Sequence, residues 1–387
     1  MNYTTINDKI RGSLMAGAAG DALGYEVEFM SRIAILKRYG EKGITMFEIE
    51  KESGKALVSD DTQMTLYTAN GILNADCQDT KPIYAIVRAY LDWLSTQNRK
   101  YLGPQKSCWL SEIKALYSLR APGNTCLSAL EAIKRGSKPI NNSKGCGGIM
   151  RVAPVSLYAA VNNRMSLSEV IRLAGDAAES THLHPLGFLS AAIFAGFIYK
   201  VVALTPSEVI NNIDDIIADV IDALDKVYQG EYEKDKCYLR DLTLKALTLA
   251  NSNATDVEAI DHLGEGWVGE EAWAVALYCT IRHIDSVEDA IIASVNHNGD
   301  SDSTGAITGN IIGAIYGYEH IKNRNIFCPD GKDLETTLEL SEVILTLADD
   351  LSQESITSTP DKNNPNEIAR YERYYNIIPL GLKEKLI

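Results

Sequence analysis

The chain has 387 residues, and its 52 acidic residues outnumber its 37 lysines and arginines, which gives a formal net charge of −15. A chain this negative is a poor partner for nucleic acid or for an anionic membrane surface, so the sequence predicts neither partner. Its seven cysteines are scattered without a Cys-x-x-Cys pair, which indicates reduced thiols and excludes a zinc ribbon or a disulfide framework. The first residues lack the basic and apolar regions of a signal peptide, so we expect a cytoplasmic protein.

Apolar residues recur at helical spacing along most of the chain. The predicted helices span residues 9–23, 62–75, 82–96, 124–135, 167–178, 186–203, 206–228, 239–250, 270–284, 286–295, 304–321 and 334–352. Strand-like alternation is confined to residues 44–47 and 56–58. The most apolar stretch runs from Leu186 to Leu204 and approaches the length of a membrane span, but Ser190 and Lys200 interrupt it. We interpret it as the buried central helix of an all-α fold.

The pattern predicts one helical domain over residues 1–352, followed by a segment over residues 353–387. Residues 353–366 are polar and contain two prolines, as expected of a linker. Residues 367–387 form a short amphipathic tail.

Two acidic clusters stand where a helical pattern begins. The first reads Ser59-Asp60-Asp61-Thr62, and the second contains Asp300, Asp302, Ser303 and Thr304. Helix capping explains one acidic or hydroxyl residue at such a place, and a capping box of Asp60 with Gln63 is one interpretation. The other is a metal site, because hard oxygen ligands of this kind suit Mg²⁺, Mn²⁺ or Ca²⁺. Two such clusters, joined by folding, have enough carboxylates to bridge two divalent ions that activate water for hydrolysis.

Small residues form stripes near both ends of the chain. Glycines stand at positions 305, 309, 313 and 317, and Ala16, Gly20 and Gly24 make a matching stripe near the start. Each glycine inside a helix costs about 1 kcal/mol relative to alanine, which is offset if two helix backbones approach closely. We therefore expect the two ends to pack together and to bring Asp21 and Glu28 towards Asp300 and Asp302.

Six stretches in order resemble the ADP-ribosylglycohydrolase family, which includes the dinitrogenase reductase-activating glycohydrolase. They are residues 12–29 (GSLMAGAAGDALGYEVEF), 59–64 (SDDTQM), 141–155 (NNSKGCGGIMRVAPV), 181–185 (THLHP), 266–279 (GWVGEEAWAVALYC) and 296–317 (NHNGDSDSTGAITGNIIGAIYG). The resemblance implies a single large helical domain with a dimetal cleft that holds two Mg²⁺ or Mn²⁺ ions.

The resemblance also implies roles for individual residues. The first ion would be bound by Ser59, Asp60 and Asp61, and the second by Asp300, Asp302 and Ser303, with Asp302 bridging. Glu28 matches the acidic residue that the family places near the metals and the scissile bond, and Glu28 and Asp61 are the acid/base candidates. The residues of the loop that would cradle the diphosphate of ADP-ribose are Gly145, Cys146, Gly147 and Gly148, with His182 beside them. Cys146 is interpreted as a small loop residue because no partner histidine indicates a nucleophile.

Three functions follow from the resemblance. The first is a metal-dependent hydrolase that removes ADP-ribose from modified proteins, above all from ADP-ribosylarginine, with hydrolysis of serine-linked or O-acetyl ADP-ribose as an alternative. The second is an antitoxin or immunity protein that binds an ADP-ribosyltransferase toxin through residues 97–123 or the tail and reverses its modification. The third is a non-enzymatic descendant of the kind found in lens crystallins, which the retention of both acidic clusters argues against.

Overall fold

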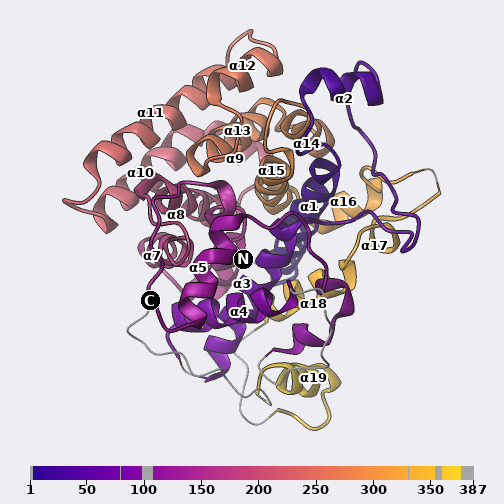
Figure 1. The fold of residues 1–387 in the computed structure, drawn as a ribbon, viewed down its shortest axis with the longest axis vertical. Helices are drawn as coiled ribbons and strands as arrows, with labels where there is room; N and C mark the ends of the chain where they lie inside the picture. The colour runs from indigo at the N-terminus through magenta and orange to yellow at the C-terminus, as the bar shows by residue number, and fades with distance from the viewer. Residues whose placement is uncertain (1–2, 79, 98–107, 330, 354–359, 376–387) are drawn as a thin grey trace.

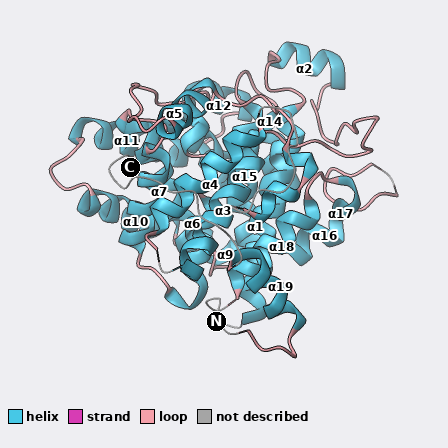
Figure 2. Ribbon diagram, turned by 60° about the horizontal axis from the view of Figure 1, so that its bottom comes forward, coloured by secondary structure: helices cyan, strands magenta, loops and turns pink. Residues whose placement is uncertain are grey.

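The structure, a computed structural model, describes residues 3–78, 80–97, 108–329, 331–353 and 360–375. Helices account for nearly all the regular structure of these residues (Figures 1 and 2). Within the described ranges no strand forms, and the only sheet-like pairing consists of two isolated bridges, Ala56 with Leu338 and Gly145 with Val268. The predicted all-α fold is confirmed, and the two short strand candidates remain extended loops.

The helices follow one another along the chain. Their bounds are α1 Tyr3–Tyr25, α2 Arg32–Tyr39, α3 Asp60–Gln78, α4 Pro82–Thr96, α5 Asn124–Lys134, α6 Ala153–Ala160, α7 Leu167–Glu179, α8 Pro185–Val201, α9 Pro206–Asn211, α10 Ile213–Val227, α11 Glu233–Ala250, α12 Asp256–Leu263, α13 Gly269–Arg282, α14 Val287–Val295, α15 Ser301–Tyr316, α16 Tyr318–Arg324, α17 Leu334–Thr337, α18 Ser341–Ser352 and α19 Pro365–Tyr374. Short 3₁₀ turns span Trp109–Glu112, Lys114–Leu116, Cys146–Gly148 and Val161–Asn163.

Helices α1 and α15, from opposite ends of the chain, lie side by side in the middle of the molecule (Figures 1 and 2). A Cβ on Gly20 would overlap the carbonyl oxygen of Gly305, and one on Gly24 would overlap that of Ser301. Only glycine allows the two backbones to approach this closely, so the glycine stripes are an interface between these helices, as predicted. This pairing places the residues that follow α1 beside the start of α15.

The central helix α8 is buried along nearly its whole length, as predicted for the apolar stretch from Leu186. Lys200 near its end reaches Asp219 on α10. No helix in the described part of the chain is long and apolar enough to cross a membrane.

Three predicted helices are each divided in two. The 206–228 segment breaks at Asn212, where α9 ends and α10 begins. The 304–321 segment breaks at Gly317, whose φ of 87° is outside the helical region, and α16 starts at the next residue. The 334–352 segment breaks before Leu340, which adopts a left-handed φ of 61°. In each case a local backbone turn interrupts an apolar periodicity that continues on both sides.

Part of the predicted segment 353–387 is helical and packs on the domain. Helix α19 places Arg373 and Tyr374 against Asp350 of α18, with hydrogen bonds of 2.7 and 2.9 Å from Arg373 and 2.9 Å from Tyr374. The remainder of that segment, residues 354–359 and 376–387, and residues 98–107 of the proposed toxin-binding loop lie outside the described residues.

Candidate functional site

The start of α3 is capped by an aspartate from another helix. The carboxylate of Asp21 on α1 accepts hydrogen bonds from the backbone N–H groups of Ser59 (2.9 Å) and Thr62 (3.1 Å), and from the Thr62 hydroxyl. Asp21 and the Ser59 hydroxyl, which accepts from the Asp61 N–H at 3.1 Å, therefore both cap α3, and the helix itself begins at Asp60. The capping-box interpretation of Asp60 is wrong, and Asp61 keeps one buried oxygen, Oδ2, without a hydrogen-bond partner.

The start of α15 is built differently, because its own aspartates cap it. Asp300 Oδ1 accepts a hydrogen bond from the Ser303 N–H at 3.3 Å, and Asp302 Oδ1 accepts one from the same group at 2.9 Å. The Thr304 hydroxyl is used inside the fold, because it donates to the carbonyl oxygen of Asp300 at 2.7 Å. The other carboxylate oxygen of Asp300, Oδ2, accepts from the thiol of Cys146.

The two helix starts and the end of α1 converge, as the glycine stripes predicted. Glu28, Asp300 and Asp302 each offer a carboxylate oxygen, and these three atoms all lie within 4.8 Å of one another. Asp60 and Asp61 interact electrostatically with Asp302 from the facing helix. All five side chains are at most 8% exposed. Residues that are separated by more than 200 positions in the sequence therefore share one buried acidic cluster.

The electrostatics of this cluster call for a cation. Burial raises the pKa of Glu28 to about 10, with the charges of Asp302 and Asp300 adding to the effect. Burial and the charge of Asp302 likewise raise the pKa values of Asp60 and Asp61 well above the usual range. Glu28 Oε2 and Asp61 Oδ2 are buried and have no hydrogen-bond partner in the structure. Orphaned, hard carboxylate oxygens at this density suit Mg²⁺ or Mn²⁺, so the residues fit a divalent metal centre.

The glycine loop lies beside this cluster and is held by the segment before α13. The N–H of Cys146 donates to the carbonyl oxygen of Trp267 at 3.2 Å, and the N–H of Gly269 donates to that of Lys144 at 2.8 Å. The N–H of Gly145 donates to the Ser143 hydroxyl at 3.3 Å. Two of the four loop amides therefore already have protein partners. An anion bound here would use the amides of Gly147 and Gly148.

His182, between α7 and α8, is buried against the loop, and its ring lies 3.0 Å from the position that a Cβ on Gly147 would take. Burial and the nearby charge of Arg151 lower its pKa to about 3, so the ring is neutral at pH 7. Arg151 donates to the Thr181 hydroxyl at 2.6 Å, and that hydroxyl lies 2.9 Å from His182 Nδ1. The Thr181 hydroxyl has two acceptors for its one hydrogen, the Ala178 carbonyl oxygen at 3.3 Å and the closer His182 Nδ1. Donation to Nδ1 leaves the proton of His182 on Nε2, facing the loop.

The sequence analysis did not select two exposed aromatic residues next to the site. Phe29 follows Glu28 directly, and Trp267 is the residue that holds the Cys146 amide. Their rings stack with centroids 6.0 Å apart and planes 18° from parallel, while Phe29 is 74% exposed and Trp267 is 38% exposed. The position of Phe29 directly after the candidate residue Glu28 was the one sequence feature that could have pointed to these aromatic residues. Asp21 and Arg151 were also missing from the set of site residues.

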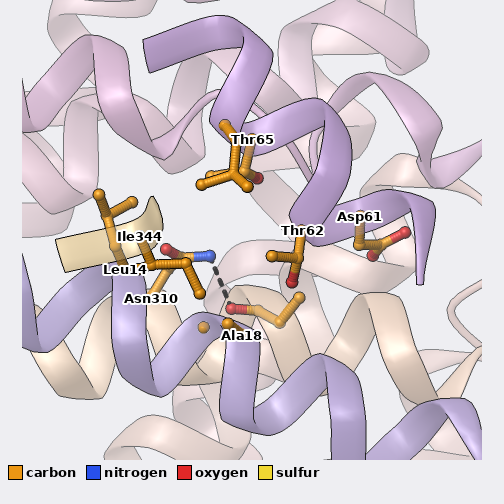
Figure 3. A pocket seen from close by; sticks show the side chains of 10 residues that line it. Leu14, Ala18, Asp61, Thr62, Thr65, Asn310 and Ile344 are labelled. Carbon is orange, nitrogen blue, oxygen red and sulfur yellow. Dashed lines mark hydrogen bonds between the residues drawn. The ribbon is translucent and has the colours of Figure 1, made fainter. Parts of the chain in front are cut away.

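A pocket lies on the inner side of the cluster, between α1, α3, α15 and α18 (Figure 3). Its cavity volume is about 10 Å³, room for about one water molecule, and its wall includes Asp61, Thr62 and Asn310. The dashed line in Figure 3 is the hydrogen bond from Asn310 Nδ2 to the carbonyl oxygen of Ala306, 2.8 Å long. This volume is below the ~300–1,000 Å³ of sites that enclose a whole small molecule. A nucleotide-sized ligand would therefore not fit in this pocket.

The sequence and the fold were compared with known proteins. The family model described as ADP-ribosylglycohydrolase matches residues 2–360, which is nearly the whole chain. The chain belongs to the ADP-ribosylglycohydrolase family. A solved structure titled "ADP-ribosylglycohydrolase-related protein complex" superposes with a TM-score of 0.59 over 91% of this chain and 99% of the other, at 20% identity. That structure supports the family fold.

Two curated relatives have informative names. Human ADP-ribosylhydrolase ARH3 is 27% identical over 195 residues, which is 46% of this chain and 52% of that protein. The chain thus matches about half the length of ARH3. The ADP-ribosylarginine hydrolase Tri1 of Serratia proteamaculans is 27% identical over 320 residues, which is 81% of this chain and 73% of that protein.

Proposed function

We propose that this protein is a metal-dependent hydrolase that releases ADP-ribose from modified proteins, and that ADP-ribosylarginine is its preferred linkage. The observation that carries the proposal is the convergence of Glu28, Asp300 and Asp302, with two orphaned carboxylate oxygens nearby, in a chain of the ADP-ribosylglycohydrolase family. A purely structural cluster would pair its buried carboxylates with basic side chains, as Asp350 is paired with Arg373.

Two divalent ions, Mg²⁺ or Mn²⁺, would be held by residues from both helix starts. Ser59, Asp60 and Asp61 would hold the first, while Asp300, Asp302 and Ser303 would hold the second, with Asp302 shared. When bound, such ions supply Lewis-acid stabilisation of charge on the ribose and lower the pKa of water towards neutrality. Removal of the ions with excess chelator is expected to abolish ADP-ribose release, and undiminished release would refute the metal requirement.

The other residues would bind and orient the substrate. The amides of Gly147 and Gly148 and the Nε2–H of His182 would donate to the diphosphate oxygens. Hydrolysis breaks the bond between C1″ of the ribose and the side-chain nitrogen, and adds the oxygen of one water to C1″. A proton from that water has to reach the leaving guanidine, and Glu28 and Asp61 would accept and return it.

The preference for arginine rests on charge and on one relative. The guanidine linkage is cationic, and the protein has a net charge of −15, which favours attraction of a cation. Tri1, an ADP-ribosylarginine hydrolase by name, matches 81% of this chain. We expect faster hydrolysis of an ADP-ribosylarginine peptide than of an ADP-ribosylserine peptide of matched sequence, with a ratio that falls as salt rises. Equal rates, or faster release from serine, would overturn the arginine preference and leave the metal requirement standing.

A cytoplasmic protein that reverses a toxin's modification would have the same chemistry. An immunity protein would, in addition, bind the ADP-ribosyltransferase toxin stably. Co-purification of the full chain with a transferase encoded beside it would test this role. The chain lacking residues 376–387 keeps α19 and its bonds to Asp350 and is the control.

A further inference from the structure

One soft ligand atom lies among the hard oxygens of the candidate metal centre. The thiol of Cys146 donates to Asp300 Oδ2, with the sulfur and oxygen 2.7 Å apart. The second oxygen of that carboxylate accepts from the Ser303 N–H, so Oδ2 is the atom of Asp300 available to a ligand. The thiol therefore contacts the very atom that would bind an ion.

The backbone fixes Cys146 in this position. Its N–H is bonded to Trp267, and its carbonyl oxygen accepts from the amides of Ile149 at 2.9 Å and Met150 at 3.2 Å. These bonds fix the backbone of Cys146 in the 3₁₀ turn, at a place from which its side chain reaches Asp300 on the facing helix start.

An independent observation indicates that a ligand belongs at this place. Asp61 Oδ2 and Glu28 Oε2 are buried without partners, although their residues are only 3% and 8% exposed. Asp61 also interacts electrostatically with Cys146. A carboxylate oxygen of Glu28 also lies within 4.8 Å of one of Asp300, the residue that the Cys146 thiol contacts.

We propose that Cys146 Sγ is a direct ligand of the ion held by Asp300, and that this thiolate makes the centre prefer Mn²⁺ over Mg²⁺. The inference rests on the proposed metal centre. Carboxylates and hydroxyls suit Mg²⁺, whereas sulfur favours softer ions, and affinities rise from Mn²⁺ through Fe²⁺ to Co²⁺. On binding, the S–H bond is replaced by a sulfur–metal bond, the proton leaves to solvent, and no oxidation state changes.

The test is a titration of the full chain with Co²⁺, in which ultraviolet absorption reports sulfur-to-metal charge transfer and calorimetry reports binding. Oxygen ligands give no such band. We expect the band in the wild type and its loss in Cys146→Ser. The matched control is Cys126→Ser, which removes a buried thiol that faces Arg151 at 3.6 Å beneath the same loop and should keep the band. A surface control is Cys237→Ser.

A second readout compares Mg²⁺ and Mn²⁺ affinities by calorimetry. Cys146→Ser is expected to lower the preference for Mn²⁺ over Mg²⁺ by about 10- to 100-fold, because serine replaces sulfur with a hard oxygen. Co²⁺ binding without a charge-transfer band in the wild type would overturn the inference and leave the metal centre intact, whatever the variants do. A band lost in Cys126→Ser but kept in Cys146→Ser would also overturn it. Absence of any heat of binding in the wild type would instead refute the metal centre.

Discussion

Replacing Asp302 by asparagine is expected to stabilise the protein when metal is removed and to destabilise it, relative to the wild type, when metal is added. Beyond the effect of burial, the charge of Asp302 is the largest electrostatic cause of raised pKa values at five neighbouring carboxyls. These are Asp21, Glu28, Asp60, Asp61 and Asp300. Asparagine keeps the oxygen that accepts from the Ser303 N–H and removes only the charge.

The size of the effect follows from the linkage between pKa and stability. One pKa unit is about 1.4 kcal/mol, so relief of repulsion on several neighbours should stabilise the metal-free protein by about 2 kcal/mol. With an unfolding entropy of about 2.1 cal/mol/K per residue, the 387-residue chain should gain about 2–3 °C in Tm. In Mn²⁺ at about one hundred times its Kd the wild type gains about 2.7 kcal/mol, which the variant largely loses.

The pH dependence has a definite sign. A carboxyl whose folded pKa is raised contributes stability that is fully present below its unfolded pKa, about 4, and is lost as the pH rises through the folded value. Burial and the charge of Asp302 raise the pKa of Asp21 to about 7, and burial with the same charge raises that of Glu28 to about 10. The metal-free wild type should therefore lose stability as the pH rises from about 5 to about 8. The advantage of the Asp302→Asn variant should grow over the same range.

The assay is thermal unfolding in chelator and in Mn²⁺, at both pH values. The control is Asp350→Asn, which removes the charge of a buried aspartate that is paired with Arg373 and Tyr374. Breaking that pair should cost about 3–5 kcal/mol with or without metal. Two results would refute the idea that a bound metal relieves repulsion among these carboxylates. One is a lower Tm of Asp302→Asn in chelator, and the other is a response of this variant to Mn²⁺ that equals that of the wild type.

Three further substitutions test the packing and the roles around the cluster. Gly24→Ala should lower the free energy of unfolding in urea by about 1–3 kcal/mol, because its Cβ would overlap a carbonyl oxygen of α15. The control Gly123→Ala should leave that free energy unchanged, because its Cβ would meet nothing within 4 Å. Glu28→Gln should lower turnover by about 10²–10⁴-fold, whereas unchanged turnover would exclude it as an acid/base residue. Thr181→Val should weaken ADP-ribose binding, measured by calorimetry, about tenfold, because His182 loses the hydroxyl that bonds its Nδ1. An unchanged affinity would contradict the assignment of the His182 proton to Nε2.

Helices with a strong one-sided apolar pattern were predictable from the sequence, as was the long apolar helix α8, whereas short helices such as α2 and α6 were missed. The bounds of α4 were predicted to the residue, and α7 within one residue. Helix α2 was missed because Ile35 is the single buried residue among its exposed charges. Helix α6 was missed for the opposite reason, since it is buried on nearly all sides and has no periodicity to detect.

The sequence by itself determined which acidic residues would begin helices and which glycines would line an interface, because both follow from local spacing. It did not determine that Asp21 would cap α3, that the Cys146 thiol would reach Asp300, or that Phe29 would stack on Trp267. Those contacts join residues that are 38, 154 and 238 positions apart in the numbering. They exist only after α1 and α15 pack backbone to backbone, and only that burial raises the carboxyl pKa values and leaves their oxygens in need of a cation.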